Sequence, residues 1–256
     1  MTNHKRAALV CLATGKYFDR FVFDLAENVG KFWLKPAQRA TTRDSWGDEP
    51  IVYDTTLFVM TDSEKPVPPG AVKLPAIHGK WPYPTLHRYH QLMENDFHFK
   101  DYDYLYQIDS DMLPVAPVTD EIIGGMVGTM SPCGFDWEKE RLPFEKNPAS
   151  LAHVQPEKYR HPYCTGAFLG GETRRVLAMM AELVAAIDVD EEKGIVAHFH
   201  EEAHLNRFFI DNPPDKFLLP SYVYPEGTVL WSKQHGFIKR IIVSRKKPED
   251  RNRGLI

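Results

Sequence analysis

Short apolar runs alternate with amphipathic segments along the first half of the chain. Residues 7–13, 55–60 and 102–108 are rich in apolar, aromatic and β-branched side chains, a pattern typical of strands buried on both faces. Residues 17–29 and 83–95 instead place their apolar side chains at the spacing of one helical face. Strands that alternate with helices in this way predict an α/β fold with a largely parallel sheet.

The second half predicts fewer strands and a long irregular segment. Residues 165–171 predict a strand that runs into a glycine turn, and residues 172–187 predict a strong helix. Residues 204–210 predict another helix, which ends near the prolines at 213 and 214. The polar, proline-bearing stretch 134–162 is interpreted as an excursion from the domain rather than as a linker between domains.

Composition narrows the class of protein. The 256 residues are 43% hydrophobic and 26% charged, which is ordinary for a soluble globular enzyme, and the net charge of −4 argues against a nucleic-acid-binding protein. The three cysteines form no C-x-x-C pair, which argues against a disulfide framework and favours a reducing, cytoplasmic compartment. The apolar run at 7–13 is too short for a signal peptide or a membrane span.

The first chemical motif is Asp109-Ser110-Asp111, which follows the apolar strand 104–108. In open α/β sheets, ligands bind beyond the carboxyl ends of the strands. Two carboxylates spaced by one residue on such a turn can both reach a hard divalent cation that bridges the oxygens of a diphosphate. The alternative interpretation is a solvated turn at a strand end, because this tripeptide also occurs by chance in surface loops.

The second motif is the acidic pair Glu201-Glu202, which opens a helix-like run. Neighbouring like charges can raise a carboxyl pKa and mark a substrate pocket, but an acidic first turn also complements the helix dipole. His198, His200 and His204 resemble a histidine ligand set. They lack the H-E-x-x-H pattern, which makes zinc a minor alternative.

Three further features carry two interpretations each. Lys80-Trp81 is either a substrate-side feature or a tryptophan anchored in the core. Arg88 is either a phosphate partner or a surface charge. The basic tail, residues 239–253, is either a solvated terminus or a segment that folds over a bound diphosphate and stabilises its charge.

Taken in order, these motifs resemble the family 6 glycosyltransferases, the relatives of the blood-group A and B transferases and of α-1,3-galactosyltransferase. The likeness extends from Ala7 to Asn252, and its last two segments are the specific ones. The matching segments are Ala13-Thr14-Gly15-Lys16-Tyr17, Phe58-Val59-Met60-Thr61-Asp62, Lys80-Trp81 with Arg88, Asp109-Ser110-Asp111, Tyr163-Cys164-Thr165-Gly166-Ala167-Phe168-Leu169-Gly170-Gly171, and His200-Glu201-Glu202-Ala203-His204-Leu205-Asn206.

The resemblance implies one GT-A domain over residues 1–256, with a Rossmann-like, mixed but mainly parallel sheet flanked by helices. Its N-terminal part would bind nucleotide, its C-terminal part would bind acceptor, and the tail 239–256 would close over the donor. It also implies a retaining transfer of galactose or N-acetylgalactosamine from a UDP donor to the 3-hydroxyl of a galactoside, possibly a fucosylated one, in α-1,3 linkage. A Mn²⁺ ion would be held by Asp109 and Asp111.

The resemblance also assigns roles to individual residues. Glu202 matches the catalytic glutamate, Thr165 to Ala167 match the segment that sets donor-sugar choice, and Arg245 and Arg251 match basic tail positions. The full donor set is Leu12, Ala13, Thr14, Tyr17, Arg88, Asp109, Ser110, Asp111, Thr165, Gly166, Ala167, Glu201, Arg245 and Arg251. The acceptor set is Ser131, Phe199, His200, Glu202 and Glu226.

The chain departs from the mammalian pattern in ways that affect the acceptor more than the reaction type. Ser131 falls where the mammalian enzymes have an acceptor-contacting histidine, Phe199 replaces a tryptophan, and Pro225-Glu226 replaces an aspartate-containing turn. The chain lacks the N-terminal tail, membrane anchor and stem of those enzymes, which favours a soluble microbial or viral-type member. Two rival functions remain: a UDP-sugar hydrolase with the same site, and a non-catalytic galactoside-binding module.

Overall fold

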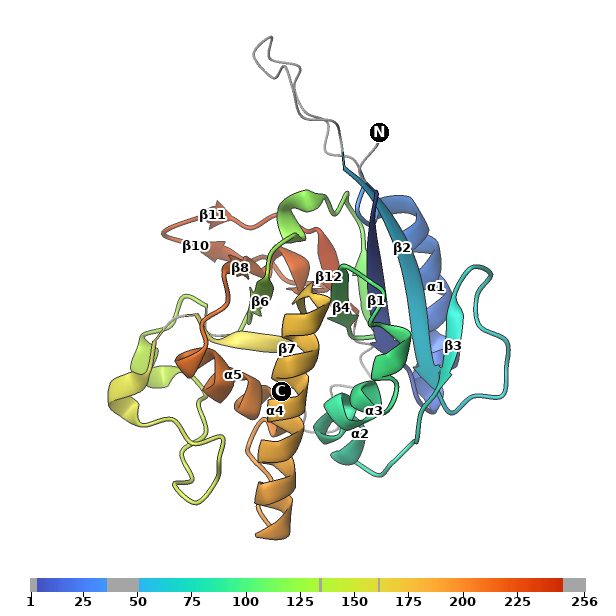
Figure 1. The fold of residues 1–256 in the computed structure, drawn as a ribbon. Coiled ribbons are helices and arrows are strands. Elements are labelled where there is room, and N and C mark those ends of the chain that lie inside the picture. Colours follow the sequence, from blue (N-terminus) through green and yellow to red (C-terminus); the bar gives the residue numbers. More distant parts are fainter. Residues whose placement is uncertain (1–3, 36–50, 134, 161, 246–256) are drawn as a thin grey trace.

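The structure is a computed structural model that describes residues 4–35, 51–133, 135–160 and 162–245. Helices and strands alternate along much of the described chain (Figure 1). They are β1 His4–Leu12, α1 Lys16–Phe32, β2 Val52–Thr61, β3 Val72–Pro75, α2 Tyr83–Leu86, α3 Arg88–Glu94, β4 Tyr104–Ile108, β5 Met112–Pro114, β6 Met126–Met130, β7 Cys164–Glu172, α4 Thr173–Glu192, α5 His200–Asp211, β8 Lys216–Leu218, β9 Tyr224–Pro225, β10 Trp231–Ser232, β11 Gly236–Phe237 and β12 Ile242–Ser244.

A seven-stranded sheet forms the centre of the molecule, in the order β3-β2-β1-β4-β7-β6-β8. All neighbouring strands are parallel except β7, which runs antiparallel to both β4 and β6. In the middle of the sheet, Leu9 of β1 pairs with Leu57 of β2 on one side and Tyr106 of β4 on the other. The predicted mixed, mainly parallel sheet is therefore confirmed.

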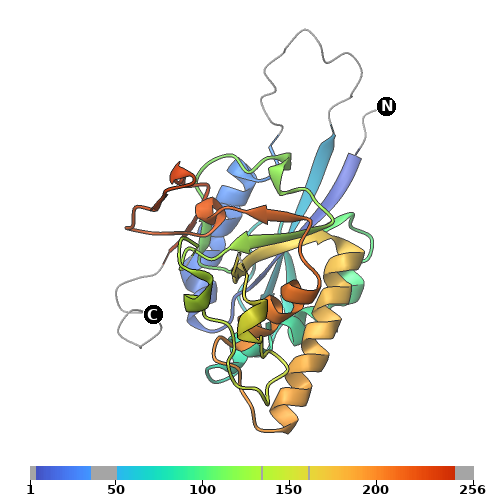
Figure 2. The same cartoon turned by 90° about the vertical axis from the view of Figure 1, so that its left-hand side faces the viewer.

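Helices cover both faces of this sheet (Figures 1 and 2). Because side chains alternate along a strand, Leu9 and Cys11 of β1 pack with α1, while Ala8 and Val10 join the core that includes α3 and α4. Phe18, Phe21, Val22, Leu25 and Val29 form the buried face of α1. A strand buried on both faces has no polar side to expose, which explains the continuous apolar run in its sequence.

The predicted elements are present, with changes at their boundaries. The helix predicted over 83–95 is divided into α2 and α3 at His87, although the His87 N–H still donates to Tyr83 O at 2.9 Å and Gln91 N–H to His87 O at 3.1 Å. The break is therefore a local distortion within one helical path. The excursion 134–162 contains only two short 3₁₀ turns among its described residues, and Leu142, Phe144 and Val154 belong to a small core of their own.

A second, three-stranded sheet orders the end of the described chain. β12 pairs antiparallel with β5 and parallel with β9. Since β5 directly follows the Asp109-Ser110-Asp111 turn, this pairing brings Arg245 beside that turn, and the Arg245 N–H donates to Asp111 O at 2.9 Å. Within the described ranges, none of the helices has the length and apolar character needed to cross a membrane.

Candidate functional site

The carboxyl ends of β1, β2 and β4 form one edge of the central sheet, as their parallel pairing requires. After β1, the chain turns at Gly15, whose φ of +55° is in the left-handed region and whose N–H donates to Asp62 Oδ1 at 2.8 Å. A Cβ at this position would lie 2.9 Å from the His78 ring, which itself contacts Thr14 Oγ1 at 3.0 Å. Glycine is therefore required where α1 begins.

The predicted uridine-contact segment lies along this edge. Ala13 and Thr14 are buried, and the Ala13 backbone is held on both sides by the end of β2: its N–H donates to Met60 O at 2.9 Å and its carbonyl accepts the Thr61 hydroxyl at 2.7 Å. Leu12 is partly buried, and the Tyr17 ring is 38% exposed at the start of α1. The segment thus combines a fixed backbone with one accessible aromatic ring.

The Asp109-Ser110-Asp111 turn follows β4 at the same edge. Ser110 and Asp111 are buried, whereas the Asp109 side chain is 32% exposed. The Gln107 amide donates to Asp109 Oδ1 at 3.2 Å, and the Asp109 N–H donates to Ala167 O at 2.9 Å. The turn is therefore tied to β7, the strand that carries the predicted donor-sugar segment.

Arg88 connects the two acidic motifs. Its guanidinium lies 2.7 Å from Asp109 Oδ1 and 3.5 Å from Glu201 Oε1, and it donates to Gly166 O at 2.7 Å. Burial alone would lower the pKa of Arg88, but the charges of Asp109 and Glu201 outweigh it and raise the pKa, so the group stays cationic. Arg88 is 8% exposed, which excludes the interpretation as a surface charge.

Glu201 is almost completely removed from water, with 2% of its surface exposed. Burial raises the pKa of Glu201 to about 8; Arg88 opposes the rise, and the charges of Glu202 and Asp109 add to it. Its Oε2 has no hydrogen-bond partner among the described residues. The raised pKa favours the protonated form of Glu201, and Asp109 is the nearer carboxylate to Arg88.

Glu202 faces β7 rather than Arg88. Its Oε2 accepts the Gly166 N–H at 2.9 Å, and burial raises the pKa of Glu202 against the opposing effect of that hydrogen bond. Asn206, one turn further along α5, is hydrogen-bonded to both backbone groups of Cys164 at 2.7 Å and donates to Glu202 O at 2.8 Å. The start of α5 and the strand β7 are thus fixed to each other.

Two of the predicted acceptor residues, Phe199 and His200, directly precede the glutamate pair. Phe199 is 39% exposed, and His200 adopts a φ of +53°, which is uncommon for a residue other than glycine. The His200 ring packs edge-on against Trp81, with 5.1 Å between ring centroids, and Trp81 is 55% exposed. That exposure excludes the interpretation of Trp81 as a core anchor.

Three other predicted residues, Ser131, Glu226 and Arg245, contact parts of the chain other than Arg88. Ser131 is buried after β6, and its N–H donates to Tyr163 O at 2.9 Å. Glu226 is exposed, and its N–H donates to Ser244 O at 3.0 Å. Arg245 forms an ion pair with Asp24 of α1 at 2.7 Å. Arg251 lies outside the described residues.

Sequence reasoning overlooked two residues that shape the site, Gln107 and His78. Gln107 is a 3% exposed polar side chain within an otherwise apolar strand, and that contrast in the sequence was a usable signal. His78 lies between predicted elements and carries no signal of its own. The histidine set His198, His200 and His204 does not form a metal-ligating group within the described chain, because His204 instead contacts the buried Asp190 at 3.5 Å.

Comparison with known proteins agrees with this architecture. The chain is 34% identical over 127 residues to human globoside alpha-1,3-N-acetylgalactosaminyltransferase 1. The matched region covers 50% of this chain and 36% of the human protein. The chain is 27% identical over 228 residues to the canine protein of the same name, covering 85% and 60%. It is 29% identical over 216 residues to rat histo-blood group ABO system transferase 1, covering 79% and 61%.

The chain spans about half the length of the curated relatives it matches. Residues 80–252, more than half of the chain, match Glycosyltransferase family 6. That family has the GT-A fold, and the mixed α/β architecture with a mainly parallel seven-stranded sheet confirms the expected fold class. The chain belongs to glycosyltransferase family 6.

Proposed function

We propose that this protein is a metal-dependent retaining glycosyltransferase that moves N-acetylgalactosamine or galactose from UDP to the 3-hydroxyl of a galactoside in α-1,3 linkage. One observation carries the proposal. Arg88 contacts Asp109 on one side and Glu201 on the other, and Gly166, whose carbonyl it binds, donates its N–H to Glu202. Two motifs that lie about ninety residues apart thus form one continuous site.

The side chains of Asp109 and Asp111 are suitable ligands for a hard divalent cation. Both offer carboxylate oxygens, which Mn²⁺ and Mg²⁺ prefer, and the Asp109 side chain is partly open to solvent at the sheet edge. We propose that these two residues hold Mn²⁺, which when bound would neutralise charge on the diphosphate of the donor. The Arg245 N–H donates to Asp111 O, and we propose that the Arg245 side chain helps to bind the same phosphates.

The chemical step assigned to the protein is stabilisation of the anomeric carbon. As the bond between that carbon and the phosphate oxygen breaks, UDP leaves with the electron pair and positive charge develops on the sugar. Glu202 would face this charge or attack the carbon, and the acceptor 3-hydroxyl would then form the new bond and lose its proton. The Gly166 N–H favours the charged form of Glu202, which either role requires.

Donor choice is proposed to depend on Thr165, Gly166 and Ala167. The proposal rests on the small side chain of Thr165, because the space beside Gly166 is already taken: a Cβ there would lie 3.2 Å from Glu201 Oε1. The human and canine relatives are named as N-acetylgalactosaminyltransferases, which favours the same donor sugar here. We therefore propose UDP-N-acetylgalactosamine as the preferred donor, with measurable use of UDP-galactose.

A donor and acceptor panel tests the proposal. The full chain is incubated with UDP-N-acetylgalactosamine or UDP-galactose, with or without a plain or fucosylated galactoside, in Mn²⁺ or in EDTA. UDP release that requires both acceptor and Mn²⁺ supports the transferase. Equal release without acceptor identifies a UDP-sugar hydrolase, and galactoside binding with no UDP release identifies a non-catalytic module.

The assignment of the two glutamates has its own experiment. Glu202→Gln should lower kcat strongly while binding of the UDP-sugar survives, as expected when only transition-state stabilisation is lost. Glu201→Gln should retain more activity because the raised pKa of Glu201 favours the uncharged form, which glutamine resembles. An inactive Glu201→Gln variant together with a nearly normal Glu202→Gln variant would reverse the two roles.

A further inference from the structure

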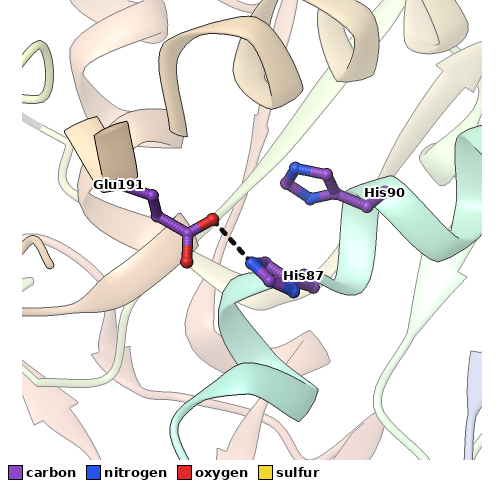
Figure 3. Close-up of side chains that lie close together, drawn as sticks. All are labelled: His87, His90 and Glu191. Carbon is purple, nitrogen blue, oxygen red and sulfur yellow. Dashed lines mark hydrogen bonds and ion pairs between the residues drawn. The ribbon is translucent and has the colours of Figure 1, made fainter. Parts of the chain in front are cut away.

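A group of metal-ligating side chains lies away from the acidic motifs, between the α2–α3 break and the end of α4. His87 and His90 approach Glu191 from the facing helix (Figure 3). One candidate ligand atom from each of the three lies within 4.8 Å of the other two, and His87 Nε2 is 2.7 Å from Glu191 Oε2. Among the described residues, this is the one group of three that meets such spacing.

The hydrogen bonding of His90 resembles that of a metal ligand. Its Nε2 is 2.8 Å from Asp188 Oδ1, one turn before Glu191 on α4, whereas its Nδ1 is buried and has no hydrogen-bond partner among the described residues. Histidines that bind metals commonly donate their other ring N–H to a carboxylate, which fixes the tautomer and leaves the remaining nitrogen with its lone pair. Nδ1 of His90 would be that remaining nitrogen.

We propose that His87, His90 and Glu191 bind a transition-metal ion of the Zn²⁺ type. Two imidazoles and one carboxylate favour such an ion over Mn²⁺ or Mg²⁺, which prefer the all-oxygen donors of Asp109 and Asp111. Tetrahedral Zn²⁺ with bonds of about 2.0–2.1 Å needs ligand atoms about 3.4 Å apart, so small side-chain rotations bring these three into range. The partial exposure of the side chains, 34% for His87, 20% for His90 and 26% for Glu191, gives the ion and a water ligand access.

The position of the group gives the ion a structural role. His87 directly precedes Arg88, the residue that connects the acidic motifs. Glu191 directly follows Asp190, which accepts the Leu151 N–H at 2.8 Å and lies 3.5 Å from His204 of α5. An ion on His87 and Glu191 would therefore fasten α3 to α4 at the place where α4 contacts α5, and it would rigidify the support of the active site. The proposal does not depend on which sugar the protein transfers.

The competing explanation is a pair of ordinary histidine–carboxylate bridges, His87–Glu191 and His90–Asp188, that hold the two helices together without metal. Both explanations predict some loss of stability when a bridge is removed. Only the metal site predicts that added Zn²⁺ stabilises the protein through these side chains. The test therefore compares the change in melting temperature that Zn²⁺ causes in each variant, and not the melting temperatures themselves.

The experiment uses the full chain, stripped with EDTA and desalted, in buffer without UDP. For the wild type we expect Zn²⁺ at 100 times its Kd to raise Tm by about 5 °C, and bound Co²⁺ to give the visible absorption of nitrogen ligation. His90→Asn and Glu191→Gln should lose both signals. Asp111→Asn, which alters the oxygen-donor site, and His235→Asn, which changes an exposed histidine elsewhere, should keep them.

Asp188→Asn provides a variant that keeps all three ligands. Loss of its charge should weaken Zn²⁺ binding by about tenfold, so it carries the test even where His90→Asn does not fold. The proposal is overturned by a wild type that does not respond to Zn²⁺, by an unchanged response in both His90→Asn and Glu191→Gln, or by a response that is lost only in Asp111→Asn. Unchanged Zn²⁺ affinity in Asp188→Asn also contradicts it.

Discussion

Two carboxylates share one guanidinium in this protein, and their surroundings differ. Asp109 lies at the end of a strand with 32% of its side chain exposed and is 2.7 Å from Arg88. Glu201 lies in the first turn of a helix with 3% of its side chain exposed and is 3.5 Å from the same group. The exposed carboxylate is the closer partner of the cation, whereas burial raises the pKa of the other to about 8.

The difference shows how one arginine can support two kinds of chemistry. The open side of the site exposes the Asp109 side chain at the sheet edge, where we propose that a cation and a diphosphate bind. The closed side removes water from the glutamates, which raises the pKa of both and would strengthen electrostatic interactions with the proposed donor sugar. Each prediction below alters one side of this comparison or the arginine between them.

The largest effect is expected at Arg88 itself. Arg88→Met removes the cation but keeps an apolar stem, and it leaves Asp109 and Glu201 without their partner. The change also leaves the Gly166 carbonyl without its donor, and the Asp109 side chain that loses the counter-charge is 32% exposed, so we expect the free energy of unfolding to fall by about 3 kcal/mol in urea denaturation.

Arg175→Met is the matched control for this change. Arg175 forms an ion pair with Asp215 in which both side chains are more than 40% exposed. Removing an exposed pair should cost less than about 1 kcal/mol. Equal losses for the two variants would show that the burial of Arg88 adds nothing to the strength of its contacts.

The next effect concerns the open side and is catalytic. Asp111→Asn removes one charge with little change in volume, and we expect turnover of the UDP-sugar to fall at least about a hundredfold in saturating Mn²⁺. Asp54→Asn, which alters an exposed carboxylate of β2, should leave turnover unchanged. Steady-state assays of UDP release check both variants. Wild-type turnover by Asp111→Asn in EDTA would remove the metal from the mechanism.

The third prediction concerns Glu201 on the closed side, which should make the stability of the protein depend on pH. In the unfolded chain Glu201 ionises near pH 4.5, whereas in the folded chain it keeps its proton to about pH 8. Between these values the unfolded state binds fewer protons, so the stability of the wild type relative to Glu201→Gln falls as the pH rises and then levels off. We expect this difference to fall by about 2 kcal/mol or more from pH 4.5 to pH 8.

Urea denaturation at pH 5, 6.5, 8 and 9 measures this trend in both proteins. Glu182→Gln provides the control, since Glu182 is an exposed glutamate of α4. Its stability relative to the wild type is measured over the same pH range for comparison. A flat curve for Glu201→Gln would mean that Glu201 is ionised throughout, and the contrast with Asp109 would disappear.

Local patterns predicted β1, α1, β2 and β4 because a strand buried on both faces and an amphipathic helix each leave their period in the sequence. They also placed Asp109 at a strand end and Glu201 at a helix start. They did not predict that Arg88 would be buried, because its partner Gly166 is 78 positions away and an arginine in a helix is usually at the surface.

Contacts of this kind depend on how elements pack, and periodicity does not record packing. The resemblance to the family predicted that Arg88 belongs to the donor site. It did not predict which side chains and backbone groups Arg88 contacts. The same limit explains why the neighbouring histidines His198, His200 and His204 attracted notice. The sequence did not predict that His87 and His90 lie beside a carboxylate, because Glu191 is 104 positions after His87.

The smallest effect concerns donor choice at Thr165, which we propose lies beside the donor sugar. Thr165 is 9% exposed, and its hydroxyl accepts the Ala167 N–H at 3.2 Å. Thr165→Met should narrow the space for an acetamido group and shift preference toward UDP-galactose. Filled apolar space discriminates by about 1–3 kcal/mol, so we expect the ratio of kcat/KM for the two donors to change by about tenfold.

Thr165→Val separates volume from hydrogen bonding, because it removes the hydroxyl without adding length. If space decides the donor, Thr165→Val should change the ratio by less than about threefold, although both variants lose the bond to Ala167. A shift of equal size in both variants would assign donor choice to the hydroxyl and the backbone it holds. A wild-type kcat/KM clearly higher for UDP-galactose would show that room beside Thr165 does not select the donor, and the determinant would then lie on the open side of the site.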